Sequence, residues 1–301
     1  MNKIKNFVYR AFVLILRHSP FDALYLKLIF RNHLGYKLNL KNPRTFHEKL
    51  QWLKLHDHNP LYTTMVDKYE VKDYVSKLVG PKYVIPLLGV WDTPEEIDWD
   101  KLPNQFVLKT TDGGGSCGVI ICKDKNSMDY QSVVNQLRES MKLDAYSRFR
   151  EWQYKNVKKR IIAEEYMEDT TSNIGGDLND YKFYCFNGVP TFCEVISGRR
   201  TKKAIDFFDL EWNHVDFCFD TYEYYEGVLE KPACFGEMVS VVSKLCKGLP
   251  YSRIDLYEVG GKVYFGEITF FPASGLLGYH PKEWNLKLGD MIDLSVIKQN
   301  N

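Results

Sequence analysis

The chain has 301 residues, 45% of them hydrophobic, which is enough to bury one large core or two to three smaller lobes. Its 40 basic and 39 acidic side chains give a formal charge of +1, which argues against an overall electrostatic attraction to nucleic acid. The seven cysteines are scattered and form no CxxC pair, so neither a zinc site nor a disulfide framework is indicated, and we expect a cytoplasmic protein.

Residues 1–60 are predicted to form an N-terminal helical extension, with helical segments at 7–16, 21–30 and 45–56. In the third segment, Thr45 and Glu48 have the spacing of a capping box, and Phe46, Leu50 and Leu53 share one face. We therefore expect this helix to pack on the protein body.

The apolar segment at 7–16, FVYRAFVLIL, is too short to span a membrane and contains Arg10. No small-residue cleavage site follows it, so it does not indicate a signal peptide. Lys3, Lys5 and Arg17 flank it. Two interpretations stay open: a helix docked on the protein body, which is favoured, and peripheral association of residues 3–17 with the inner face of a membrane.

The next two regions are predicted to be a small α/β segment at 61–105 and a lobe at 106–167. The first contains a helix that ends at Gly80-Pro81 and a short strand before residue 91. The second contains the strand FVLKTT, the glycine loop DGGGSCG, the strand VIIC, a helix at 127–141 and the strand RIIAEEYM.

The last region, 168–301, is predicted to be a second lobe. It contains a hairpin at 180–195 turning at Asn187-Gly188, a β segment at 207–219, a helix at 235–247 and a hairpin at 252–269. The chain is therefore of the α+β class, and its glycine loop and its last hairpin fall in different lobes.

The last hairpin, SRIDLYEVGGKVYFGEIT, carries charges at alternate positions. A three-residue loop, 260–262, or an equivalent bulge, would place Asp255 opposite Glu267, with Arg253 and Thr269 on the same face. A two-residue loop would move Glu267 to the other face. Two directly opposed carboxylates repel unless a cation lies between them, and their oxygen ligands suit Mg²⁺; an exposed face whose charges pair only with water is the alternative that the hairpin leaves open.

The glycine loop follows Asp112 and contains Gly113, Gly114, Gly115 and Ser116. Glycines let backbone amides converge on phosphate oxygens, and Lys109 at the end of the preceding strand supplies a cation. The loop is neither a Walker A loop nor a dinucleotide fingerprint, because it joins two strands. An ordinary flexible hairpin is the alternative.

Taken in order, FVLKTTDGGGSCGVIIC, RIIAEEYM and RIDLYEVGGKVYFGEITFFPASG resemble the ATP-grasp superfamily. The pieces NPRTFHEKLQWLK, DKYEVKDYV, IPLLGVWD and DYKFYCFNG resemble its TupA-like branch, which is linked to bacterial surface polysaccharides, including teichuronopeptide. The resemblance implies two α+β lobes that clasp ATP, preceded by the helical extension.

The resemblance also implies roles for residues that bind ATP. Lys109 would contact the α- and β-phosphates, and the glycine loop would close over them. Glu164 would accept the adenine amino group, while the backbone of Tyr166 and Met167 would hold the ring. Asp180 would reach the ribose, and Lys182 would reach the γ-phosphate.

For the metal and the reaction, the resemblance implies that Asp255 and Glu267 hold Mg²⁺ and that Arg253, with Lys182, is catalytic. Thr269 stands where the family usually has an Asn ligand, so a hydroxyl or water completes the metal shell. Ser274 and Gly275 would meet the acceptor.

These parts predict an ATP-dependent carboxylate-amine ligase that makes an amide through an acyl phosphate on a sugar acid or amino acid and a polysaccharide precursor. Arg199 and Arg200 are candidates for gripping an anionic substrate, or they form a solvated basic turn. Three alternatives remain: a glycosyltransferase using the Asp98-Trp99-Asp100 motif, an ATP-grasp kinase for a sugar or polyol, and a catalytically silent ATP-binding scaffold.

Overall fold

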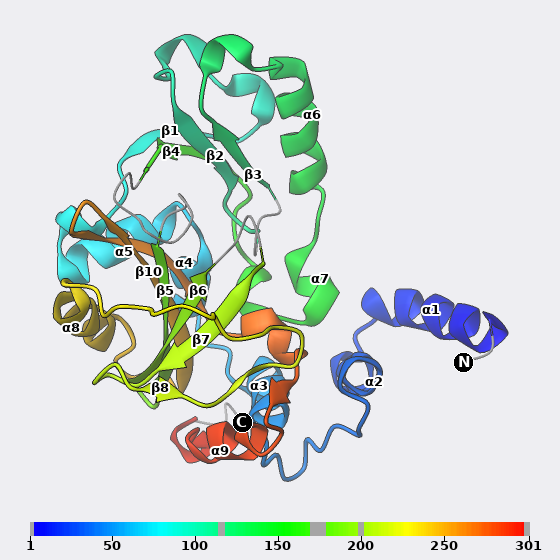
Figure 1. Cartoon of the computed structure of the whole chain (residues 1–301). Helices are drawn as coiled ribbons and strands as arrows, with labels where there is room; N and C mark the ends of the chain where they lie inside the picture. Colours follow the sequence, from blue (N-terminus) through cyan, green and yellow to red (C-terminus); the bar gives the residue numbers. More distant parts are fainter. Residues whose placement is uncertain (1–2, 114–117, 169–178, 198–201, 298–301) are drawn as a thin grey trace.

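The protein is described by a computed structural model that covers residues 3–113, 118–168, 179–197 and 202–297. Its first third is mostly helical, as predicted (Figure 1). The helices are α1 (Lys3–Arg17), α2 (Asp22–Leu34), α3 (Phe46–His56), α4 (Leu61–Val66) and α5 (Glu70–Val79). The predicted capping box is confirmed: the Thr45 side chain accepts a hydrogen bond from the Glu48 amide, and the Glu48 side chain accepts one from the Thr45 amide.

The first of two lobes is built on a four-stranded antiparallel sheet, which we call the lid sheet. Its strand order is β1-β4-β2-β3, from β1 (Leu87–Trp91), β4 (Ile161–Glu165), β2 (Phe106–Thr110) and β3 (Val119–Cys122). Helix α6 (Tyr130–Met141) buries Val133 and Leu137 against this sheet, and Asp129 caps its first turn. The short α7 (Ala145–Phe149) follows.

The second lobe is built on a six-stranded antiparallel sheet, which we call the core sheet. Its order is β11-β10-β5-β6-β7-β8, from β11 (Lys262–Thr269), β10 (Tyr251–Val259), β5 (Asn179–Phe186), β6 (Val189–Ser197), β7 (Ala204–Phe208) and β8 (His214–Val215). The predicted turn at Asn187-Gly188 is confirmed, with both residues at positive φ. Helices α8 (Phe235–Leu245) and α9 (Trp284–Asp290) and the strand pair β9 (Cys218–Phe219) and β12 (Tyr279–His280) complete the lobe.

Buried apolar side chains form one large cluster under the core sheet, one under the lid sheet and one around α1 and α2. The structure divides residues 61–105 between the first two: Tyr62, Met65 and Val75 join the core cluster, whereas β1 pairs with β4 of the lid sheet. Helix α3 also packs in the core cluster through Phe46, so the helical extension is partly integral to the second lobe. No helix among the described residues combines the length and apolar character that crossing a membrane requires.

Candidate active site

The acidic hairpin β10–β11 has the predicted pairing of Asp255 with Glu267, but it reaches that pairing by another route. The loop is the two residues Gly260-Gly261 and not three residues, and both glycines adopt the positive φ of a tight two-residue turn, so the predicted alternative, an equivalent bulge, applies. A β-bulge at Gly266 then supplies the extra residue that restores the register. A Cβ at Gly266 would lie 2.9 Å from the Asp255 carbonyl oxygen, so the bulge requires glycine.

The bulge places Arg253, Asp255, Glu267 and Thr269 in direct contact. The Arg253 guanidinium binds both Asp255 oxygens at 2.7 and 2.8 Å and Glu267 Oε1 at 3.0 Å. The Thr269 hydroxyl donates to the same Glu267 oxygen at 3.0 Å. The carboxylates thus pair with protein cations and not only with water, which answers the alternative that the sequence left open.

Lys182 on β5 lies opposite Asp255 and adds a second cation to the cluster. Its ammonium bonds to Asp255 and lies 2.7 Å from Asp180 Oδ2. Burial by itself would lower the pKa of Lys182, but Asp255 and Asp180 raise it above its ordinary value. Burial would likewise raise the pKa of Asp255, but Arg253 and Lys182 hold it below its ordinary value. Both groups are therefore charged at neutral pH.

The donor set fits a Mg²⁺ ion. Asp180, Glu194, Asp255 and Glu267 outnumber the cations Arg253 and Lys182, so the cluster has an acidic excess. The Glu267 side chain is 37% exposed, which leaves its carboxylate open toward an arriving ion. Within the described parts of the chain, no group of three or more acidic, histidine or cysteine side chains is arranged to hold a metal alone. Magnesium commonly uses one or two carboxylates and completes its shell with water and substrate phosphates, so this sparse donor set is adequate.

The lid sheet brings Lys109 and Glu164 together, although the resemblance gives them different ATP contacts. The Lys109 ammonium lies 2.5 Å from one Glu164 oxygen, and the Lys72 ammonium of α5 lies 2.5 Å from the other. Burial would raise the pKa of Glu164, but the two lysines outweigh it and lower the pKa. Glu164 is therefore a charged anchor that positions two ammonium groups.

Lys68 and Lys72 are site residues that the sequence reasoning missed. Lys68 donates a hydrogen bond from its ammonium to the carbonyl of Gly113, at the start of the glycine loop. Burial lowers the pKa of Lys68, while the negative charge of Glu267 opposes that shift, so Lys68 is within electrostatic reach of the core sheet. The sequence feature that could have identified Lys68 and Lys72 is their spacing of four residues in DKYEVKDYV, just before the lid strands.

The turn that follows β11 carries the predicted acceptor residues Ser274 and Gly275. Ala273 and Ser274 adopt φ values of 46° and 56°, which only a well-anchored turn maintains outside glycine. The Ser274 hydroxyl donates to Glu151 Oε1 at 2.5 Å. The buried Gln51 of α3 donates to the carbonyls of Ser274 and Gly275 at 3.0 and 3.1 Å.

The structure describes some of the remaining predicted residues and not others. Tyr166 and Met167 are half-buried and lie directly after β4. Asp98 is paired with Lys101 at 2.8 Å in the lid lobe, and its neighbours Ile97 and Leu102 belong to the lid cluster. Five predicted residues lie outside the described residues: Gly114, Gly115, Ser116, Arg199 and Arg200.

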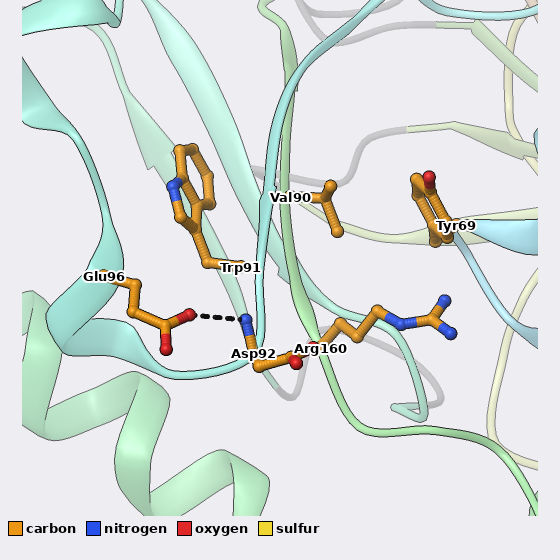
Figure 2. A pocket seen from close by; sticks show the side chains of 6 residues that line it. All are labelled: Tyr69, Val90, Trp91, Asp92, Glu96 and Arg160. Atoms are coloured by element: carbon orange, nitrogen blue, oxygen red, sulfur yellow. Dashed lines mark hydrogen bonds between the residues drawn. The ribbon is translucent and has the colours of Figure 1, made fainter.

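A hollow of about 390 Å³ opens between the lid lobe and the start of α5. Arg160 lies over the Tyr69 ring at 4.9 Å and within 3.3 Å of Glu70, and thereby joins the strand leading to β4 to α5. The residues that line the hollow, shown in Figure 2, are Tyr69, Val90, Trp91, Asp92, Glu96 and Arg160. None of them is a predicted site residue, and the hollow lies where the lid lobe meets the start of α5.

A family model described as TupA-like ATPgrasp matches residues 48–293, which is most of the chain. The chain belongs to the TupA-like ATP-grasp family. The predicted membership is therefore confirmed, and with it the ATP-grasp fold of two α+β lobes. No curated protein matches the chain.

Several solved structures are similar to this TupA-like ATP-grasp protein. The D-alanine–D-alanine ligase from Bacillus anthracis has 20% identity and a TM-score of 0.44, over 79% of this chain and 70% of that one. The ligase of the same name from Helicobacter pylori has 14% identity and a TM-score of 0.43, over 82% and 69%. A RimK domain ATP-grasp protein from Sphaerobacter thermophilus has 12% identity and a TM-score of 0.41, over 77% and 69%. These similarities are distant, so the family assignment rests on the family model.

Proposed function

We propose that this TupA-like ATP-grasp protein is an ATP-dependent carboxylate-amine ligase that forms an amide bond on a cell-surface polysaccharide or its precursor. The observation that supports the proposal is that lysine ammonium groups lie on the lid side while carboxylates lie on the core sheet. Lys109 and Lys72 are held on the lid side by Glu164, whereas the buried Asp255 and the partly exposed Glu267 lie on the core sheet beside Arg253. The lysine ammonium groups can bind the anionic phosphates of ATP, and the carboxylates can coordinate a Mg²⁺ ion that is bound to those phosphates.

The lysines would bind and orient the triphosphate. Lys68 bonds to the first glycine of the loop and is within electrostatic reach of Glu267 as well as of Lys109 and Glu164. A lysine held in this way stabilises anionic oxygens without reorganising at the moment of reaction. The Mg²⁺ that Asp255 and Glu267 would hold, with Thr269 beside them, neutralises phosphate charge when bound.

The proposed reaction has two steps that balance. A carboxylate oxygen of the first substrate attacks the γ-phosphorus, the bond to the bridging oxygen breaks, and ADP leaves with that electron pair. The amine of the second substrate then attacks the acyl carbon, the carbon–oxygen bond to phosphate breaks, and phosphate leaves while the amine proton passes to solvent. Positioning and charge neutralisation carry both steps, so no covalent enzyme nucleophile is needed.

The turn at Ala273–Gly275 would bind the second substrate. It follows Glu267 and Thr269 directly in the chain, so a group bound there lies beside the reacting end of the nucleotide. The link to polysaccharide comes from the family name and the resemblance alone. Sugar acids and amino acids are therefore the substrate classes to test first.

Hydroxylamine trapping tests the proposal. The protein is incubated with ATP, Mg²⁺, hydroxylamine and candidate uronic or amino acids; an acyl phosphate would yield a hydroxamate together with ADP. ADP with a stable phosphorylated product and no hydroxamate would replace the ligase by the kinase alternative. Lys109→Met should abolish hydroxamate formation, and Asp98→Asn is the matched control that should not. Sugar-nucleotide hydrolysis that requires Asp98 and ignores Lys109 would instead identify a glycosyltransferase.

A further inference from the structure

Positive charge is concentrated at the start of the chain, although the whole protein is nearly neutral. Residues 1–47 contain nine lysines and arginines and a single acidic residue, Asp22. The totals of 40 basic and 39 acidic residues therefore leave 31 and 38 for the remainder, a formal charge of −7. The N-terminal segment is thus a basic unit attached to an acidic body.

The same segment exposes large apolar side chains. On α1, Phe12, Leu14 and Ile15 are 45%, 59% and 70% exposed, and just beyond it Phe21 and Leu24 are 62% and 45% exposed. Figure 1 shows α1 standing beyond α2 at the edge of the molecule, with no other drawn element over it. So many large exposed apolar side chains within a short basic segment indicate an interaction surface.

Arg150 fixes the orientation of this surface. Its side chain, only 2% exposed, donates to the carbonyls of Leu16, Arg17 and Ser19 at 3.0, 2.8 and 3.1 Å, where α1 ends. It also pairs with Asp22 at 2.5 Å. Arg150 therefore holds the end of α1 against the α7 turn and neutralises the one acidic residue of the segment. Among the described side chains, those that remain exposed include the basic Lys27 and Arg31 of α2 and the apolar side chains given above.

We propose that α1 and α2 bind the surface of a bilayer that contains anionic lipids. The basic side chains match anionic headgroups, and the exposed apolar side chains match the acyl boundary beneath them. Helix α1 has 15 residues and is roughly 22 Å long, shorter than the roughly 30 Å hydrocarbon core, so it lies in the interface and does not cross it. The proposal is independent of the ligase activity, because it uses none of the active-site residues.

Vesicle flotation with the full chain tests the proposal. Wild-type protein should float with vesicles of phosphatidylcholine mixed with phosphatidylglycerol, should be released by high salt, and should not float with phosphatidylcholine alone. Ile15→Asp should reduce the bound fraction roughly tenfold, because it puts a charge in the apolar face. Val228→Asp is the matched control, since Val228 is an exposed apolar side chain, 86% accessible, far along the chain from α1.

A second pair of variants tests the charge. Lys27→Glu with Arg31→Glu on the exposed side of α2 should also weaken flotation, whereas Lys244→Glu on α8 should not. Equal binding to neutral and anionic vesicles, or unchanged binding by Ile15→Asp, would overturn the proposal. The proposal would also be overturned if light scattering detected a dimer in the absence of lipid and Ile15→Asp dissociated it, because a second copy of the chain would then cover this face. Unchanged melting temperatures of the variants show that loss of binding is not loss of fold.

Discussion

The Lys54 ammonium donates a hydrogen bond to the main-chain carbonyl of Ser274 at 2.8 Å, so helix α3 holds the turn that follows the acidic hairpin. Lys54 also donates to Gln51 at 3.0 Å, and Gln51 bonds to the same turn. Burial lowers the pKa of Lys54 to about 8, while the charge of Glu151 opposes the shift. A buried lysine is costly unless it is fully bonded, and here its bonds maintain two residues at positive φ. The helix is thereby part of the proposed acceptor site.

Gln51→Leu should therefore weaken binding of the acceptor substrate more than binding of ATP. It removes the Gln51 donor to the Gly275 carbonyl and one of the two donors to the Ser274 carbonyl, so the turn can relax. We expect KM for the acceptor to rise roughly tenfold while KM for ATP stays within about twofold. Lys49→Met is the control, since Lys49 on the same helix bonds to the carbonyl of Ile292 and not to the turn. Equal changes in both KM values would mean that Gln51 acts only on stability.

Glu267→Gln should stop product formation while the protein stays folded. Glutamine keeps the size of the side chain and can accept from Arg253 and Thr269, but it lacks the negative charge that a Mg²⁺ ion needs. We expect kcat to fall by about a thousandfold or more, measured as ADP release at saturating Mg²⁺. Turnover close to that of the wild type would remove Glu267 from the metal site.

Lys72→Met should weaken both the fold and ATP binding. It leaves Glu164, which is 5% exposed, with Lys109 as its one remaining lysine partner, so the unfolding free energy should fall by about 1–3 kcal/mol. The increase in melting temperature that ATP gives should also shrink. Lys77→Met, on the same helix and in a pair whose lysine is 73% exposed, should change stability by less than about 0.5 kcal/mol. Adding Glu164→Gln to Lys72→Met should recover stability, and failure to do so would contradict the pairing.

Gly266→Ala should disrupt the bulge that sets the register of the site. The new Cβ would meet the Asp255 carbonyl oxygen and the Tyr257 ring, each at 2.9 Å, so a loss of about 1–3 kcal/mol and of activity is expected in urea unfolding and ADP assays. Gly236→Ala in α8 is the control: a Cβ there meets nothing within 4 Å, and helix propensity predicts a gain of about 0.5–1 kcal/mol. Wild-type stability of Gly266→Ala would show that the strand shifts without cost.

His47 should make stability depend on pH. Burial lowers the pKa of His47 to about 4, although its Nε2 lies 2.8 Å from the Leu277 carbonyl oxygen. The ordinary value of 6.5 applies to the unfolded chain, so between pH 4 and 6.5 the unfolded state binds more protons, and the unfolding free energy rises with pH. The contribution gained across that window is about 3 kcal/mol. His47→Gln should remove this increase of the unfolding free energy with pH, measured by urea titrations at several pH values. An unchanged pH dependence would contradict the role given to His47.

The sequence alone was sufficient for the order of elements and for the family. Period-two alternation predicted the hairpins, the Thr45 and Glu48 spacing predicted the start of α3, and the ordered motifs predicted ATP-grasp membership, because these signals are local. Asp255 and Glu267 were paired correctly, but the choice between a three-residue loop and a bulge was left open, since a glycine in a bulge resembles any other strand glycine until its neighbours are placed.

Only the tertiary structure determined which charged side chains contact one another. Lys72 and Lys109 are 37 positions apart in the numbering and converge on one carboxylate, and Lys54 reaches a carbonyl 220 residues away. Such contacts depend on how helices seat against sheets, and burial then decides which ionised groups must find partners. The basic, apolar character of the first helices was visible in the sequence. Its exposure was not, because a helix with this composition packs inward or outward according to the body that it meets.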